Sequence, residues 1–100
     1  FDFLLLATNQ LVNHLDKLQE VTHGHFKAKV IIRVGIGSRS PLYPGVQHCG
    51  DYTEAFRALL RNVVVVKLDR PKGIVSTYQT AYHSKEPFMI VEDMNDYRME

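Results

Sequence analysis

Hydrophobic and polar positions alternate between helical and extended spacing along the chain. In residues 3–18 the leucines recur at helical intervals, which predicts an amphipathic helix with Asp2 as its N-cap. Gly24 is expected to end the helical segment in a left-handed conformation. Residues 28–34 predict a strand, and the pair Ile31-Ile32 indicates burial on both of its faces. The stripe of the first helix consists of Leu4, Leu11, Leu15 and Leu18.

The second half continues this alternation. Residues 51–60 predict a helix capped by Asp51 or Thr53. The four valines at 63–66 predict a central strand of a parallel sheet, because consecutive β-branched residues disfavour a helix. A third helix is expected between Asp69, its candidate N-cap, and Pro87, followed by a strand at 88–91 and a polar tail at 92–100. The third helix would pack through Ile74, Tyr78, Ala81 and Tyr82.

The order of these elements, α-β-α-β-α-β, predicts an α/β fold in which helices flank a parallel sheet. The three strands are expected near residues 28–34, 63–67 and 88–91. Three strands are few for such a sheet. The sequence also begins with Phe1, inside a hydrophobic run, and has no initiator Met. We therefore expect residues 1–100 to form a single, partial domain that associates with itself or with a larger partner. Leu4, Leu5 and Leu6 in succession also favour an interface, because one helix face does not bury all three.

The composition and net charge of the chain limit the kinds of partner that we expect it to bind. The chain has 100 residues, 45% of them hydrophobic, and a formal net charge of +1. This balance gives no reason to expect nucleic acid or a membrane as partner. Cys49 is the only cysteine, so an intrachain disulfide is excluded and an intracellular compartment, cytoplasm or mitochondrial matrix, is expected.

Residue types suited to chemistry gather in the stretch 33–50, which holds four glycines, two prolines, one histidine and the cysteine. This stretch is predicted to leave the carboxyl end of a strand, where parallel sheets bind ligands. His48 is the main candidate, because its titration range suits proton transfer near neutral pH. The alternative is a loop histidine bonded to backbone. Cys49 is interpreted as a small buried residue rather than a nucleophile, and the pair His23 and His25 as a solvated helix end.

Several motifs, in order and spacing, resemble the pyrimidine-binding domain of thiamine-diphosphate enzymes. The greatest similarity is to the beta subunit of the 2-oxoacid dehydrogenase decarboxylase component, and transketolase is a more distant relative. The amino-terminal helix, the following turn and strand, the active-site histidine loop and the later strand and proline positions all contribute. The matching residues are Asp2-Phe3 with Ala7, Gln10 and Asn13; residues 24–27 and 30–33; Gln47-His48 with Glu54-Ala55-Phe56; and residues 64–66, Pro71 and Glu86-Pro87.

The resemblance implies roles for two residues. His48 matches the histidine near the reactive thiazolium, which helps bind substrate or moves a proton. Phe3 matches an aromatic of the aminopyrimidine pocket, the alternative being a core residue at a helix start. The glutamate that drives the cofactor's imino tautomer, and the stacking aromatic, would lie upstream of Phe1. The glycine-rich turn of the family is altered here at residues 35–40.

The resemblance also implies cofactors and partners. Thiamine diphosphate with Mg²⁺ would be the cofactor, with the diphosphate and metal held by another domain. A 2-oxoacid would be the substrate, and an alpha-type subunit the partner in a homo- or hetero-oligomer. The chain would supply the pyrimidine-side half of the active site and would not act alone. The alternatives are a non-catalytic interaction module or a small-molecule-binding module of the same fold.

Overall fold

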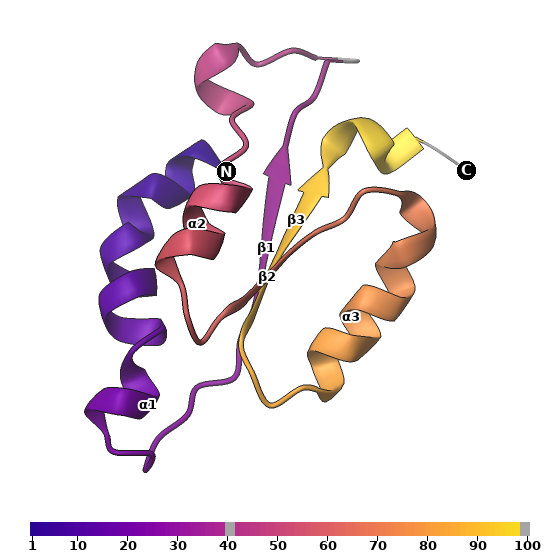
Figure 1. The fold of residues 1–100 in the computed structure, drawn as a ribbon. Coiled ribbons are helices and arrows are strands. Elements are labelled where there is room, and N and C mark those ends of the chain that lie inside the picture. Colours follow the sequence, from indigo (N-terminus) through magenta and orange to yellow (C-terminus); the bar gives the residue numbers. More distant parts are fainter. Residues whose placement is uncertain (40–41, 99–100) are drawn as a thin grey trace.

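The protein is built on a three-stranded parallel sheet. The computed structural model describes residues 1–39 and 42–98. The strand order is β1 (Ile31–Ile36), β3 (Phe88–Asp93) and β2 (Val64–Lys67), with Ile31 and Val64 both opposite Phe88. The arrowheads of β1 and β3 point toward the same end of the molecule (Figure 1). The predicted α/β class with a parallel sheet and flanking helices is therefore confirmed.

Helices cover both faces of the sheet. The amino-terminal helical segment and α2 (Thr53–Leu59) lie on one side, and α3 (Ile74–His83) lies on the other (Figure 1). Alternate side chains of each strand point to opposite faces, so the sheet separates two hydrophobic clusters. The first cluster includes Leu11, Val34, Phe56, Val65, Met89 and Val91, and the second consists of Leu68, Ala81, Phe88 and Ile90.

The central strand is β3 and not the valine strand, which corrects the sequence prediction. Met89, Ile90 and Val91 have no exposed surface, whereas Val64 at the edge of the sheet is 39% exposed. A run of β-branched residues indicates a strand but does not distinguish an edge from the centre. That position depends on the crossover that returns the chain from β2 between the two earlier strands.

The amino-terminal segment is helical, but not as one regular α-helix over residues 3–18. It has 3-10 geometry over Asp2–Ala7 and π geometry over Gln10–Leu15, and it ends in α1 (Leu18–Val21). The predicted N-cap is also wrong, because the Asp2 side chain bonds residues far along the chain. Leu11 is buried as the stripe requires, while Leu5 and Leu6 are 47% and 85% exposed.

The strand ends differ from prediction at the carboxyl edge of the sheet. β1 begins at Ile31 and continues through Ile36, because it pairs with β3 as far as Asp93. β3 likewise extends past residue 91, and Glu92 is only 7% exposed. The expected polar tail therefore contributes two strand residues, and Met94–Arg98 forms a 3-10 turn. Both strands therefore extend further at their carboxyl ends than the sequence predicted.

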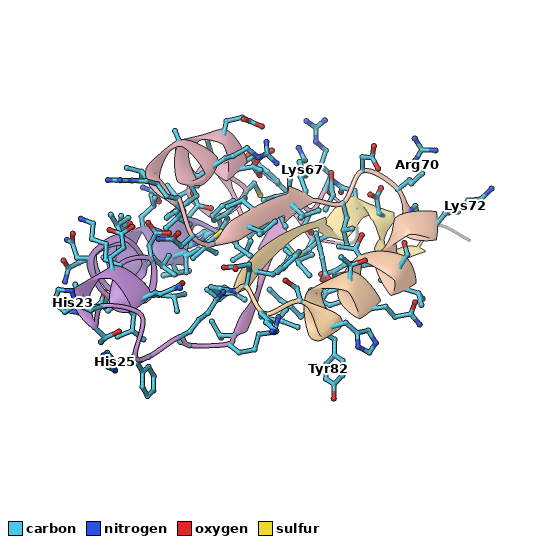
Figure 2. All side chains as sticks on the ribbon, turned by 60° about the horizontal axis from the view of Figure 1, so that its bottom comes forward. His23, His25, Lys67, Arg70, Lys72 and Tyr82 are labelled. Atoms are coloured by element: carbon cyan, nitrogen blue, oxygen red, sulfur yellow. The ribbon has the colours of Figure 1, made fainter. Side chains whose placement is uncertain are left out.

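The third helix begins later than expected. Pro71–Gly73 forms a 3-10 turn preceded by Arg70, and α3 follows it directly, so Asp69 is not its N-cap. Ala81 is fully buried, but Tyr82 is 73% exposed and points away from the sheet (Figure 2). In the described part of the chain, no helix is long and apolar enough to cross a membrane.

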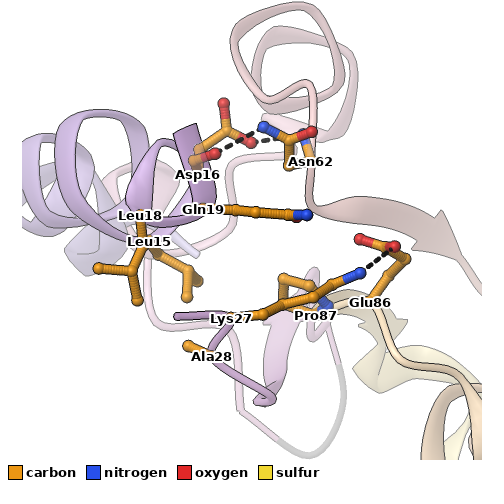
Figure 3. Close-up of a pocket in the computed structure, with 9 residues that line it drawn as sticks. All are labelled: Leu15, Asp16, Leu18, Gln19, Lys27, Ala28, Asn62, Glu86 and Pro87. Carbon is orange, nitrogen blue, oxygen red and sulfur yellow. Dashed lines mark hydrogen bonds and ion pairs between the residues drawn. The ribbon is translucent and has the colours of Figure 1, made fainter. Parts of the chain in front are cut away.

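The amino end of the sheet offers little space for a ligand. A hollow between α1 and the turn before β3 has a volume of about 10 Å³, room for no more than a single water (Figure 3). The Lys27–Glu86 ion pair (2.5 Å) closes one side of it. His23 and His25 are exposed at the end of α1, as expected for a solvated helix end, and Gly24 has the predicted positive φ of 82° (Figure 2).

Candidate functional site

The candidate site lies at the carboxyl edge of the sheet. β1 leaves the sheet at Gly37, and the chain returns through a 3-10 turn, Val46–His48, to the start of α2. The amino-terminal segment begins beside the same edge (Figure 1). Within the loop of the sequence prediction, Ser40 and Pro41 lie outside the described residues. The tertiary structure therefore gathers segments from opposite ends of the sequence at one edge.

Asp2 ties the amino-terminal segment to the histidine loop. Its Oδ2 accepts a hydrogen bond from Gly50 N at 3.0 Å, and its Oδ1 accepts one from the Tyr52 hydroxyl at 2.9 Å. Burial raises the pKa of the Asp2 carboxyl, but these hydrogen bonds outweigh it and hold the pKa below its usual value. Gly50 leaves room for this contact, since a Cβ there would lie 2.6 Å from the Tyr52 hydroxyl.

This tie brings together the two residues that the sequence singled out. The rings of Phe3 and His48 have centroids 5.5 Å apart and an interplanar angle of 31°. We call these two residues the aromatic pair. The Phe3 side chain is 72% exposed, and His48 is also exposed. Phe3 is therefore not a core residue, and the two tilted rings form an exposed aromatic surface.

A separate cleft of about 380 Å³ opens between the carboxyl ends of β1 and β3. His48 does not line it, although its neighbours Val46 and Cys49 do. The 3-10 turn thus borders the cleft through Val46 and carries His48 of the aromatic pair outside it. The walls of the cleft combine polar and apolar residues, which are Ile36, Gly37, Ser38, Arg39, Tyr43, Val46, Cys49, Gly50, Asp93 and Asn95.

Hydrogen bonds hold the cleft walls in place. Asn95 Oδ1 accepts a bond from Arg39 N at 3.0 Å, and Asn95 N donates to Asp93 Oδ1 at 2.9 Å. The Ser38 hydroxyl donates to the Leu42 carbonyl at 2.6 Å. The Cys49 thiol contacts the Ser38 carbonyl at 3.9 Å, and Cys49 is half-buried and lines the cleft rather than being fully buried as the sequence interpretation had it. These contacts join the exits of β1 and β3.

Sequence reasoning missed a buried carboxylate, Glu92, at the same edge. Its two oxygens accept hydrogen bonds from Arg33 (2.9 and 3.3 Å), the Tyr78 hydroxyl (2.7 Å) and the Tyr97 hydroxyl (3.1 Å), which we call the Glu92 network. The only sequence signal is an acidic residue directly after an apolar strand run. The network joins β1, α3 and the last turn to the central strand.

The Glu92 network shifts the titration of its members. Burial raises the pKa of Glu92, but the bonds from Arg33 and the two tyrosines outweigh this and lower the pKa below its usual value. Burial and the bond to Glu92 raise the pKa of Tyr78 to about 12. Glu92 is therefore ionised near neutral pH and serves as an anchor rather than as a proton carrier.

No group of three His, Cys, Asp or Glu side chains suited to a metal ion occurs among residues 1–39 and 42–98. Compared with known proteins, the chain matches no family model and no curated protein.

Proposed function

We propose that this chain supplies the pyrimidine-side half of a thiamine-diphosphate site in a 2-oxoacid dehydrogenase beta subunit or a transketolase-like enzyme. The observation that carries the proposal is the aromatic pair. The motif resemblance assigns roles to both Phe3 and His48, which are 45 positions apart in the sequence, and their rings lie 5.5 Å apart at the carboxyl edge of the sheet. Parallel sheets bind ligands at this edge.

The aromatic pair fits the aminopyrimidine end of this cofactor. A flat heteroaromatic ring stacks favourably on an aromatic face, and the 72% exposed Phe3 ring has such a face available. The cofactor supplies the carbanion chemistry through its ylid. In the proposed site, Phe3 orients the ring and His48 holds or moves a proton at one of its imidazole nitrogens. The diphosphate and Mg²⁺ are assigned to a partner domain, an alpha-type subunit or a second copy.

Asp2 has a positioning role in this proposal. Its bonds to Gly50 N and the Tyr52 hydroxyl fix the spacing between the amino-terminal segment and the histidine loop. Small errors in such spacing reduce catalytic rates strongly. We therefore propose that Asp2 sets the distance between the members of the aromatic pair, without contacting substrate itself.

The test compares His48→Gln and Phe3→Ala in the native complex that contains this chain. Single-turnover decarboxylation of a 2-oxoacid is measured with saturating thiamine diphosphate and Mg²⁺. His48→Gln is expected to lower the rate by roughly 10²–10⁴-fold with little change in cofactor binding. Phe3→Ala is expected to weaken cofactor binding instead, measured by calorimetry.

Matched controls are available in the same chain. His25→Gln and Phe26→Ala change exposed residues at the opposite end of the sheet, and both are expected to leave rate and affinity unchanged. The isolated 100 residues are expected not to bind thiamine diphosphate tightly. Micromolar binding by the chain alone, or unchanged rates in His48→Gln, would contradict the proposed division of the site.

A further inference from the structure

The cleft lies where the chain leaves neighbouring strands toward opposite faces of the sheet. From β1 the chain passes to α2, on the side of the amino-terminal segment, and from β3 it turns to the side of α3 (Figure 1). Such a divergence leaves a crevice between two adjacent strands, and open parallel sheets bind ligands in that crevice. Ile36 and Asp93, the paired last residues of β1 and β3, both line the cleft.

The backbone around the cleft is held in an unusual conformation. Gly37 and Ser38 have successive positive φ angles of 75° and 97°. A serine at such an angle is strained, and strained residues gather at ligand sites. Gly37 is also packed tightly, because a Cβ there would lie 2.7 Å from Asn95 Nδ2 and 2.9 Å from Asp93 Oδ1. The close approach fixes the width of the cleft at its floor.

Two donor groups at the cleft make no bond to any described residue. The Arg39 backbone is anchored to Asn95, yet its guanidinium forms no hydrogen bond or ion pair with residues 1–39 or 42–98. Asn95 Nδ2 likewise donates to no group in these ranges. Charged and amide donors of this kind suit a planar acid group, because guanidinium pairs with carboxylate or phosphate oxygens.

One acidic residue, Asp93, also lines the cleft. Asp93 Oδ1 already accepts a bond from Asn95 N at 2.9 Å. The pKa of Lys67 is raised mainly by its hydrogen bond to Asp51, and to a smaller extent by the negative charge of Asp93. Lys67 pairs with Asp51 at 2.6 Å and not with Asp93, so the acid group of a ligand is placed on Arg39, the cation that lines the cleft.

We propose that the cleft binds a small organic anion, with its acid group on the Arg39 guanidinium and Asn95 Nδ2. The non-polar body of the ligand rests on Ile36, Tyr43 and Val46, which give the cleft its apolar walls. A volume of about 380 Å³ lies within the range of small-molecule sites. Val46 of the turn Val46–His48 lines the cleft, whereas His48 of the same turn belongs to the aromatic pair and does not line it. The proposed anion site uses neither member of the aromatic pair, so it does not depend on the proposed thiamine function.

The experiment titrates the ¹⁵N-labelled chain with three probes and follows backbone amide shifts. The probes are 4-methylpentanoate, its uncharged amide as a matched control, and phenyl phosphate. Saturable shifts are expected with 4-methylpentanoate at residues 36–39, 49–50 and 93–95, and only weak shifts with the amide. Saturation with phenyl phosphate alone would also support the anion site and would assign it to phosphate esters.

Two arginine variants test the assigned donor. Arg39→Gln is expected to weaken binding by about 10- to 100-fold, the effect of losing a charge-assisted bond. Arg61→Gln removes an exposed guanidinium outside the cleft and is expected to leave affinity unchanged. The proposal is overturned if no probe saturates, or if the amide binds as tightly as the acid. It is also overturned if Arg39→Gln binds the acid probe as tightly as Arg61→Gln does. The amide spectrum of each variant reports directly whether it is folded.

Discussion

Glu92→Gln tests the main polar anchor at the carboxyl edge of the sheet. The substitution keeps the shape of the side chain but removes the charge that Arg33 Nη2 contacts at 2.9 and 3.3 Å. It also places an amide NH₂ where one carboxylate oxygen accepts from Tyr78 or Tyr97. The Glu92 side chain is only 9% exposed, so water does not replace these contacts.

The expected loss follows from the bonds that change. A hydrogen bond to a charged group contributes about 1.5–3 kcal/mol. The Arg33 side chain is 65% exposed, so its contribution lies toward the lower end of that range. With one tyrosine bond weakened as well, we expect the free energy of unfolding to fall by about 2–3 kcal/mol, or roughly 8–24 °C in Tm for a domain of this size.

The pH dependence distinguishes a charge effect from a packing effect. The pKa of Glu92 is lower in the folded chain than its ordinary value of 4.5. Its stabilising contribution is therefore present above that value and is lost as the pH falls through the folded pKa. The difference in stability between wild type and Glu92→Gln should be full at neutral pH and should shrink as the pH falls below 4.5 and through the folded pKa of Glu92.

Thermal unfolding followed by far-UV circular dichroism measures this difference. Glu54→Gln is the matched control, because Glu54 is 82% exposed and pairs with Arg57 one turn along α2. An exposed pair contributes about 0.5 kcal/mol or less, so the control should change Tm by only a few degrees. The reasoning would be refuted if the two variants lowered Tm equally, or if the decrease in Tm caused by Glu92→Gln did not change with pH.

Three further substitutions probe the edges of the sheet. In wild type the Lys29 ammonium donates a hydrogen bond to the carbonyl of the fully buried Ala81, and Lys29→Met removes this donor. The free energy of unfolding, measured in urea, should fall by about 1–3 kcal/mol. Gly37→Ala should destabilise more than Gly24→Ala in the same assay. Both have positive φ, but only Gly37 has an amide nitrogen 2.7 Å from the added Cβ. Asp2→Ala should separate the aromatic pair, seen as loss of nuclear Overhauser contacts between the two rings; persisting contacts would exclude the positioning role of Asp2.

The sequence by itself determined the class of fold. Runs such as residues 63–66 and 88–91 are apolar and rich in β-branched residues, and the helical spacing between them requires crossovers, so a parallel sheet follows. The loop after β1 was also identifiable, because glycine, proline and histidine gather there. From this loop alone His48 was a candidate, and the resemblance added Phe3.

Only the tertiary structure decided which of these residues meet. The order of strands depends on the crossover that places β3 between β1 and β2, and the valine run carries no information on that order. The bond from Gly50 N to Asp2 spans 48 positions, and the Arg33–Glu92 pair spans 59. Neither contact has a local signature, because the partners, a backbone amide and a carboxylate in one case and two charged side chains in the other, are brought together only by the folded edge. The aromatic pair, the cleft and the Glu92 network are consequences of that folded edge.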